Sequence, residues 1–446
     1  MKIIIAGAGE VGFHLAKQLS GDSHDITVID INPGQLQKVD SQTEVLTIAG
    51  SSTSIDTLKA AKIDKNDLLV SVTSTEAINI NTAILARKLG VRKTIARVEN
   101  DEYLNPEFRD MFVSLGIDHL IYPEELAAHE IVKLIQRAAA TDVLEFEGGK
   151  LMLLGLKLDK QAPVIRKTMR QTSEESEGKD FRIVAIHRGM RTIIPSGEDI
   201  FLPNDQIFVI STPDRIKDIL KSSGKEDTKI ENIMILGGGK IGRKTAKLLE
   251  NDINVKLIES DEEKTLDLAD YLKKSLVIKG DGRDIDLLAQ EGIIDMDAFI
   301  SVTEDAETNI ITSLMAKHLG VSKTVALVDN VDYIPLTQTI GLDSLINKKL
   351  IAANNISRFI RKENIISIAT LQGIDAEVFE YVAGEKSDVT KKPVKDLSFP
   401  KNAIIGGYIR NGKGLITVGN TQIEAGDKVV VFALPGAIDK VEKYFQ

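Results

Sequence analysis

Two glycine-rich segments carry the residue types that hold a nucleotide pyrophosphate, and each lies between a short apolar run and a helical pattern. In a GxGxxG loop the first glycine permits a tight turn, the second lets the phosphates approach the backbone, and the third lets the helix pack against the sheet. The N–H groups at the helix start then bind the phosphates. One such loop is a weak signal, but two in one chain predict nucleotide binding. The loops are Gly7, Ala8, Gly9, Glu10, Val11, Gly12 and Gly237, Gly238, Gly239, Lys240, Ile241, Gly242.

In each copy, an acidic residue ends the second apolar run, which is the run that follows the glycine loop. Asp30 follows Gly12 by 18 residues, and Glu259 occupies the matching place in the second copy. A carboxylate there accepts hydrogen bonds from an adenosine ribose and repels a 2′-phosphate, which favours NAD over NADP.

Further candidate residues follow the ends of the later strands, where ligands of open α/β sheets bind. Two alternatives remain open: the threonines serve only as helix N-caps, and Arg97 forms only a surface ion pair. The candidates are Ser51, Thr73, Ser74 and Arg97 in the first copy and Asp281, Thr303 and Glu304 in the second.

The two copies differ within the loops. Glu10 of the first copy aligns with Lys240 of the second, and Arg97 aligns with Leu327. A lysine can bind an additional phosphate, as in ATP, whereas a glutamate disfavours one. We therefore expect two sites with different ligand preferences.

The elements that position these residues repeat along the chain. KIIIAGAGEVG (2–12) returns as NIMILGGGKIG (232–242), and the offset of 230 later falls to 225 and then to 222. In the first copy, short apolar runs at 2–6, 25–30, 45–49, 68–73, 94–98 and 119–122 alternate with helical patterns such as 77–89. This alternation predicts an α/β fold: a Rossmann-like, doubly wound parallel sheet in each copy.

A small α+β module follows each sheet. Runs at 143–146 and 151–158 flank a glycine turn and predict a hairpin; a polar loop (171–180), two further strands (181–188 and 205–212) and a short helix (214–220) complete the module. The polar segment 221–229 is the expected linker. We therefore divide the chain into domains 1–140, 141–225, 230–364 and 365–446.

Composition limits the function classes. The chain has 446 residues, 43% of them hydrophobic and 27% charged, which is typical of a globular protein with ample core. Its net charge of −10 and 4% aromatic content disfavour nucleic-acid binding. It contains no cysteine, which suits a reducing cytosol. No apolar run reaches the roughly 18 residues that span a bilayer, so we expect no direct membrane insertion.

The sequence shows no duplicated catalytic machinery. His14 aligns with Lys244, His129 with Asn354 and His318 with Lys88, so no histidine of these domains recurs as a base. HExxH, CxxC, GxSxG and Walker A motifs do not occur. We expect neither an enzyme nor a metal site.

The tandem plan, with the segments VTSTEAINI (72–80) and VTEDAETNI (302–310), resembles the regulatory subunits of bacterial Trk-type potassium transporters, which contain two RCK (regulator of potassium conductance) units. The resemblance covers essentially the whole chain. It implies a cytoplasmic protein at the inner face of the cell membrane that binds NAD or NADH. It also implies a homo-oligomer, either a dimer or a tetrameric ring, on a membrane-embedded potassium channel or transporter subunit. The lysine at position 240 favours ATP or ADP at the second site.

The resemblance also assigns the glycine loops, acids and strand-end residues above to the two nucleotide sites, and the small modules to the RCK C-terminal type. Members of the family often carry Asp after the glycine that ends strand three; Asp281 fits, whereas Ser51 departs from this pattern. Leu327 likewise departs from the expected arginine.

Other interpretations remain. A dinucleotide fold also suits a soluble NAD-dependent oxidoreductase or redox sensor, and a similar regulator could serve another cation channel. The apolar stripe of helix 124–140, formed by Leu126, Ile131, Leu134 and Ile135, suits a crossover that pairs subunits or packing within one domain.

Overall fold

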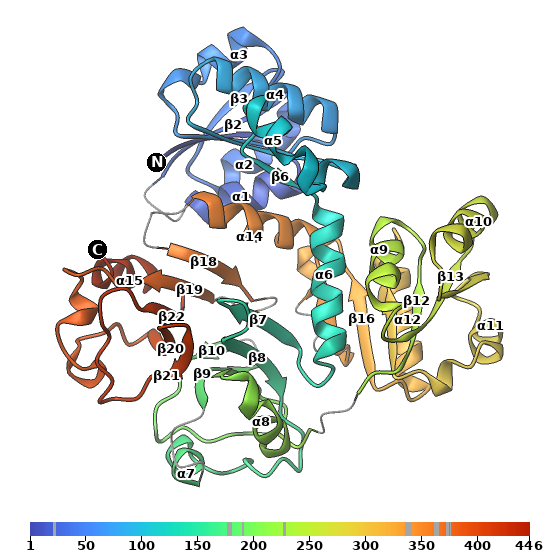
Figure 1. The fold of residues 1–446 in the computed structure, drawn as a ribbon, viewed down its shortest axis with the longest axis vertical. Helices are drawn as coiled ribbons and strands as arrows, with labels where there is room; N and C mark the ends of the chain where they lie inside the picture. Colours follow the sequence, from blue (N-terminus) through green and yellow to red (C-terminus); the bar gives the residue numbers. More distant parts are fainter. Residues whose placement is uncertain are drawn as a thin grey trace. The chain divides into compact units, whose positions relative to one another are not determined.

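The chain folds into two compact units in a computed structural model (Figure 1). The structure describes residues 1–20, 24–175, 181–189, 191–225, 229–334, 340–360, 365–371, 374 and 376–446. The first unit contains Met1–Ala127 and Asn347–Arg361, and the second contains Ala128–Ile346 and Lys362–Gln446. Within the described residues, no helix has the length and apolar character needed to cross a membrane.

The first unit is built on a six-stranded parallel sheet with the order β3-β2-β1-β4-β5-β6. This is the doubly wound order of dinucleotide-binding folds, and it confirms the predicted fold class. The apolar run of β1 is buried because helices cover both faces of the sheet. The strands are β1 (Lys2–Ala6), β2 (Asp25–Asp30), β3 (Leu46–Ala49), β4 (Leu68–Ser71), β5 (Lys93–Arg97) and β6 (His119–Ile121).

Helices connect these strands. The helix predicted at 77–89 is α4, shifted by one residue, and α2 begins where the side chain of Asn32 caps the N–H groups of Gly34 and Gln35. The helices are α1 (Glu10–Ser20), α2 (Pro33–Gln42), α3 (Ile55–Ala60), α4 (Glu76–Lys88), α5 (Pro106–Ser114) and the start of α6 (Pro123–Gln136), with the 3-10 turns η1 (Ile63–Lys65) and η2 (Asp101–Leu104).

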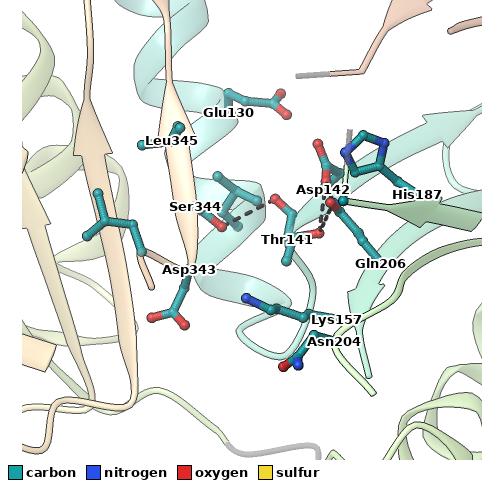
Figure 2. Close-up of a pocket in the computed structure, with 13 residues that line it drawn as sticks. Glu130, Thr141, Asp142, Lys157, His187, Asn204, Gln206, Asp343, Ser344 and Leu345 are labelled. Carbon is teal, nitrogen blue, oxygen red and sulfur yellow. Dashed lines mark hydrogen bonds between the residues drawn. The ribbon is translucent and has the colours of Figure 1, made fainter. Parts of the chain in front are cut away.

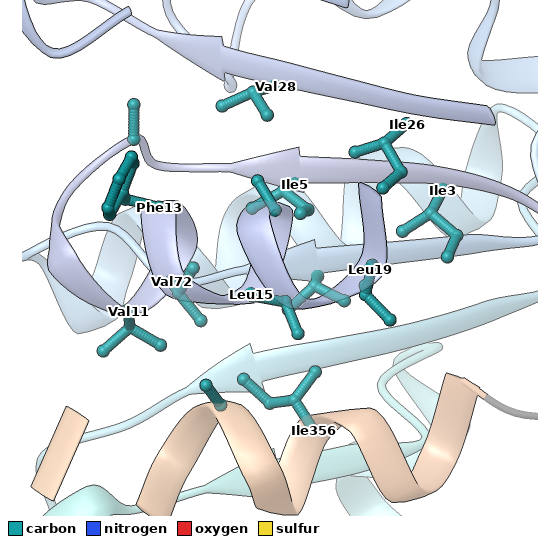
Figure 3. Packing of buried hydrophobic residues seen from close by; sticks show 14 of the residues in the cluster. Ile3, Ile5, Val11, Phe13, Leu15, Leu19, Ile26, Val28, Val72 and Ile356 are labelled. Carbon is teal, nitrogen blue, oxygen red and sulfur yellow. The ribbon is translucent and has the colours of Figure 1, made fainter. Parts of the chain in front are cut away.

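A helix from the middle of the second copy completes the first unit. In α14 (Lys348–Ile360), Ala352, Ala353 and Ile356 are buried in one apolar cluster with α1 and the sheet (Figure 3). The Ser357 hydroxyl donates to Gln18 Oε1 at 3.1 Å. The rings of His119 and Phe359 lie 3.9 Å apart, centroid to centroid. Sequence order assigns α14 to segment 230–364, whereas in space it packs on the first sheet.

The second unit contains an equivalent parallel sheet with the order β14-β13-β12-β15-β16-β17. Its strands are β12 (Asn232–Leu236), β13 (Asn254–Glu259), β14 (Leu276–Lys279), β15 (Ala298–Ser301), β16 (Lys323–Leu327) and β17 (Ser344–Ile346). Its helices are α9 (Lys240–Leu249), α10 (Glu262–Tyr271), α11 (Ile285–Gln290) and α12 (Ala306–His318), with the turns η4 (Ile293–Asp295) and η5 (Val331–Tyr333).

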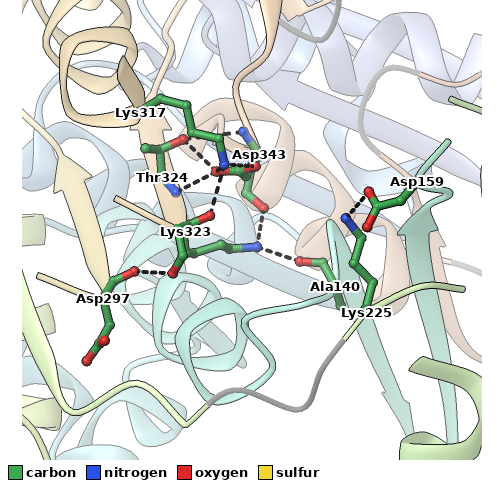
Figure 4. A network of polar contacts seen from close by, with 10 residues as sticks. Ala140, Asp159, Lys225, Asp297, Lys317, Lys323, Thr324 and Asp343 are labelled. Atoms are coloured by element: carbon green, nitrogen blue, oxygen red, sulfur yellow. Dashed lines mark hydrogen bonds and ion pairs between the residues drawn. The ribbon is translucent and has the colours of Figure 1, made fainter. Parts of the chain in front are cut away.

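A buried lysine fastens the segment after α6 to the edge of this second sheet (Figure 4). Lys323 Nζ donates to the carbonyl of Ala140 at 2.5 Å and to Ser344 Oγ at 2.9 Å, and Ser344 Oγ donates to the carbonyl of Thr141 at 3.2 Å. Burial lowers the pKa of Lys323 to about 8. The aligned Lys93 of the first copy is exposed, so this contact is particular to the second sheet.

Each small module is a five-stranded antiparallel sheet, and both have the same topology: β10-β9-β11-β8-β7 and β21-β20-β22-β19-β18. The first contains β7 (Asp142–Phe146), β8 (Leu151–Lys157), α7 (Met169–Glu175), β9 (Phe181–Arg188), β10 (Arg191–Ile193), β11 (Gln206–Ser211), η3 (Pro213–Arg215) and α8 (Ile216–Ser222). The second contains β18 (Ile365–Thr370), β19 (Glu377–Val382), η6 (Asp388–Thr390), η7 (Val394–Asp396), β20 (Ala403–Arg410), β21 (Lys413–Ile416), β22 (Lys428–Ala433) and α15 (Ile438–Tyr444).

The two modules share one apolar core inside the second unit. Phe208 of β11 and Phe432 of β22 belong to the same buried cluster, with ring centroids 6.2 Å apart. Gly406 lies at a close approach of the two modules, since a Cβ there would be 2.2 Å from Ile210 Cδ1. The sequence predicted the modules but not this pairing.

The prediction of a polar loop at 171–180 is wrong for residues 171–175. Residues 171–175 belong to α7, because Thr168 and Gln171 form a capping box: Thr168 N–H donates to Gln171 Oε1 (2.9 Å) and Gln171 N–H to Thr168 Oγ1 (3.1 Å). Residues 176–180 lie outside the described residues, as do 226–228 of the predicted linker, whose first two residues extend α8.

The apolar stripe of α6 is buried within this single chain. Ile131 is fully buried, and Leu134 and Ile135 are each 2% exposed. Leu126 packs against the core of the first unit. The stripe is thus shared between the two units and not packed within one domain, and the pairing of subunits by this helix stays a prediction.

Two candidate nucleotide sites

The first glycine loop connects β1 to α1 through three glycines in different environments. Gly7 has a φ of 111°, and its N–H donates to the carbonyl of Ile29 at 2.8 Å. A Cβ at Gly12 would lie 1.8 Å from the Gly7 carbonyl oxygen, so only glycine fits. A Cβ at Gly9 would meet no atom within 4 Å, which leaves the backbone open to a ligand. Gly237, Gly242 and Gly239 repeat these three environments in the second copy.

The acid at the end of the second strand holds each loop. Asp30 Oδ2 accepts from Ala8 N–H at 2.6 Å, and its Oδ1 accepts from Asn32 N–H at 2.8 Å. Glu259, 9% exposed, accepts from Gly238 N–H at 2.8 Å through Oε2 and from Ser260 N–H at 2.8 Å through Oε1. These contacts place both acids beside their glycine loops.

A buried asparagine in each copy joins the ends of two strands, and the sequence reasoning missed its role. Asn79 Oδ1 accepts from Ser71 Oγ, Thr73 N–H and Thr73 Oγ1, and its Nδ2 donates to the carbonyls of Thr73 and Arg97, at 2.7–3.1 Å. Asn309 makes the same five contacts in the second copy. The equivalence of Asn79 and Asn309 in the repeat was the available signal.

This network rules out the N-cap interpretation of the threonines. Helix α4 begins at Glu76 with Thr75 as its N-cap, and α12 begins at Ala306 with Asp305 as its N-cap. Thr73 and Thr303 instead donate their hydroxyls to the asparagines, each at 2.7 Å. Ser74 and Glu304, which follow them, are exposed at the same edge of the sheets.

Arg97 does form the ion pair that was one of its two interpretations. Its guanidinium lies 3.2 Å from Glu99 Oε1, and its side chain is 20% exposed at the carboxyl end of β5. Leu327, in the same position of the second copy, is buried. The ion pair does not exclude a contact between Arg97 and a nucleotide, and that contact stays a prediction.

The segment after the third strand differs between the copies. The Ser51 hydroxyl pairs with Thr53 Oγ1 at 2.8 Å, whereas Asp281 pairs with Arg283 at 2.7 Å. The hydrogen bonds from Arg283 lower the pKa of the Asp281 carboxyl. Arg283 was not predicted, and with Lys240 it gives the second site two cations where the first has Thr53 and Glu10.

The predicted residues gather at the carboxyl edge of each sheet. The Gly50 N–H donates to the Asp30 carbonyl at 2.9 Å, which places Ser51 next to the acid. A Cβ at Gly7 would lie 2.9 Å from Thr73 N, so the loop also adjoins the end of β4. Val11 and Ile241 are buried and offer only backbone groups, while Glu10 and Lys240 are exposed as the first residues of α1 and α9.

A separate cavity of about 430 Å³ lies in the second unit and contains none of the predicted residues (Figure 2). Its lining includes Asp142, whose Oδ2 accepts from Gln206 Nε2 at 2.9 Å, and His187, whose Nδ1 lies 2.9 Å from Thr192 Oγ1. Across the described residues, no group of three His, Cys, Asp or Glu side chains is placed to hold a metal ion.

The repeated sheets, loops and modules define a class: proteins assembled from two nucleotide-domain units of the RCK type. The TrkA-N domain model matches residues 3–123 and 233–348, and the TrkA-C domain model matches 153–224 and 378–446. The chain belongs to the TrkA family.

Relatives cover the whole chain. The Trk system potassium uptake protein TrkA homolog 2 of Methanosarcina mazei is 34% identical over 457 positions, with full coverage of both chains. The Trk system potassium uptake protein TrkA of Vibrio alginolyticus is 33% identical and covers 100% of this chain and 99% of its own.

Solved structures share the fold. The GsuK channel bound to NAD superposes with a TM-score of 0.60 at 18% identity, covering 100% of this chain and 78% of that one. The crystal structure of the GsuK RCK domain gives 0.60 at 17% identity, with coverage of 100% and 94%.

Proposed function

We propose that this chain is a cytoplasmic, nucleotide-binding regulatory subunit that gates a membrane-embedded potassium channel or transporter of the Trk type. One observation carries the proposal: a glycine loop, a loop-anchoring acid and a strand-joining asparagine occur together twice in one chain. The names of the full-length relatives support the link to potassium uptake. The chain acts at the inner face of the cell membrane as a homo-oligomer, a dimer or a tetrameric ring, held there by its partner.

The first site binds NAD or NADH. Asp30 lies beside the loop and disfavours a 2′-phosphate, and the open side of Gly9 admits the pyrophosphate. The residues that we assign to this site are Gly7, Ala8, Gly9, Glu10, Val11, Gly12, Asp30, Ser51, Thr73, Ser74 and Arg97.

The second site accepts ATP or ADP as well as NAD. Lys240 provides positive charge where the first site has Glu10, and Arg283, which is paired with Asp281, stands where the first site has Thr53. Charge-assisted hydrogen bonds to phosphate are strong. The residues that we assign to this site are Gly237, Gly238, Gly239, Lys240, Ile241, Gly242, Glu259, Asp281, Thr303 and Glu304, together with Arg283.

Gating follows from unequal binding to two shapes of the assembly. A nucleotide shifts such an equilibrium only by the difference in its affinity for the two states. A coupling free energy of about 1–3 kcal/mol is typical and corresponds to a 5- to 150-fold bias.

The test is affinity capture of the tagged chain from gently solubilised native membranes, with partners identified by mass spectrometry. We expect a polytopic potassium-transport subunit that is released or rearranged when NADH is exchanged for ATP. A preparation without a membrane partner that instead turns over hydride would contradict the proposal and favour a soluble NAD-dependent oxidoreductase. Gly9→Asp and Gly239→Asp variants, which place a carboxylate in one phosphate site at a time, serve as matched single-site controls.

A further inference from the structure

The carboxylate of Glu10, in the first phosphate loop, has a cationic partner on α14. Lys349 Nζ lies 3.4 Å from Glu10 Oε2, and Lys38 Nζ of α2 lies 3.8 Å from Glu10 Oε1. The Lys349 side chain is 21% exposed, against 45% for Lys38. Because solvent screens an exposed charge more strongly, Lys349 is the principal partner of Glu10.

Glu10 occupies the place where its charge opposes a ligand. It is the first residue of α1, and the N–H groups at this helix end are those that bind a pyrophosphate. An uncompensated carboxylate at this point repels the phosphates. A cation that both neutralises it and directs it toward α14 leaves the open side of Gly9 available.

The two copies differ together at these positions. Glu10 aligns with Lys240 at the offset of 230, and Lys349 aligns with Glu124 at the later offset of 225. Both positions are acidic in the first copy and basic in the second, so opposite charges meet where the helix of the second copy packs on the loop of the first, as Lys349 and Glu10 do.

We propose that Lys349 is a positioning residue of the first nucleotide site: it acts through Glu10 and makes the loop competent to bind a nucleotide with a pyrophosphate group. This rests on the proposed nucleotide binding by the first site. It also means that the first site is complete only when α14 is packed on α1, so a segment translated with the second copy sets the affinity of the first.

The experiment uses the full chain carrying Gly239→Asp, which closes the second site. The φ of Gly239 is −61° and a Cβ there meets no atom within 4 Å, so the substitution leaves the fold intact. Isothermal titration calorimetry with NADH and with adenosine then compares Lys349→Met with Lys348→Met. Lys348 is the matched control, because it is adjacent on α14 but lies 3.7 Å from Glu124 and not beside the loop.

We expect Lys349→Met to weaken NADH binding about tenfold and Lys348→Met less than twofold. Adenosine, which has no phosphate, should bind equally to all variants. If Lys349 had only a structural role, its replacement would weaken the binding of adenosine as well. The double variant Glu10→Gln/Lys349→Met should recover the NADH affinity, since it removes the carboxylate that Lys349 compensates.

Two results would overturn the inference: unchanged NADH affinity in Lys349→Met, or no recovery in the double variant. The second result would also be obtained if Lys349→Met detached α14 from α1, because replacing Glu10 does not restore that packing. Absence of NADH binding in the Gly239→Asp parent, by contrast, would contradict the proposed first site itself.

Discussion

Replacing Asn79 with alanine tests whether one side chain holds the first nucleotide edge together. Asn79 is 1% exposed and makes five hydrogen bonds that join the ends of β4 and β5. A net value of about 1 kcal/mol for each bond gives an upper limit near 5 kcal/mol. Because Thr73 is partly exposed and water can replace some of these contacts, we expect about 3 kcal/mol.

Hydrogen–deuterium exchange with mass spectrometry measures this loss where it occurs. About 3 kcal/mol of local stability corresponds to roughly 150-fold faster exchange in peptides that cover β4 and β5. Asn81→Ala is the matched control, since Asn81 lies on the same helix and is exposed. We expect its peptides to exchange as in the wild type, because exposed substitutions change stability by about 0.5 kcal/mol or less.

The same variant connects the fold to ligand binding. Asn309→Ala should accelerate exchange only in β15 and β16, because its five contacts lie in the second sheet. In the Gly239→Asp background, Asn79→Ala should also weaken NADH binding. If Asn79→Ala and Asn81→Ala exchange alike, the asparagine does not join the strands and the reasoning fails.

Three further predictions concern stability. Gly12→Ala should lower the thermal unfolding temperature, because its Cβ would lie 1.8 Å from the Gly7 carbonyl oxygen, while Gly9→Ala, which meets no atom within 4 Å, should not. Burial would raise the pKa of Glu250, but hydrogen bonds from Lys247, Lys274 and Ser275 lower it to about 2. The ionised carboxylate therefore contributes about 3 kcal/mol to the free energy of unfolding, and urea titrations should show this contribution being lost as the pH falls from 4.5 toward 2. The Glu250→Gln variant should lack this pH dependence. Burial lowers the pKa of His119, which lies against Phe359 of α14, so the packing of α14 should weaken as the pH falls below 6.5. Hydrogen–deuterium exchange in α14 measures this weakening. The His119→Phe variant keeps a ring against Phe359 and should remove the pH dependence.

Local patterns carried the prediction of the sheets. Strands buried on both faces appear as apolar runs, so β1 and β2 were predicted with their observed bounds and β3 to within one residue. The hairpin at Glu147-Gly148-Gly149 followed from its glycines, and all three residues have positive φ. The acids and glycines could be placed because the parallel topology brings strand ends to one edge.

Long-range pairings could not be predicted in this way. The alanines and Ile356 of α14 form a stripe that suits any apolar surface, so nothing local assigns them to α1. The shared core of the small modules depends on Phe208 and Phe432, which are more than 200 residues apart, roughly half the chain. The strand-joining role of Asn79 became apparent only from the structure, because a polar residue inside a helix is ordinarily expected to be exposed, whereas Asn79 is buried.

The place of α14 in the first unit has a consequence for synthesis of the protein. Residues 1–127 leave the ribosome early, but the helix that covers α1 follows only after roughly 220 more residues. At about 5–20 residues per second this interval is on the order of 10–45 s. The first nucleotide domain to be made is therefore among the last to be finished, and its apolar face stays uncovered while the rest of the chain is translated. A chaperone that binds nascent chains would find its substrate here, and a chain truncated after the first copy would expose that face permanently.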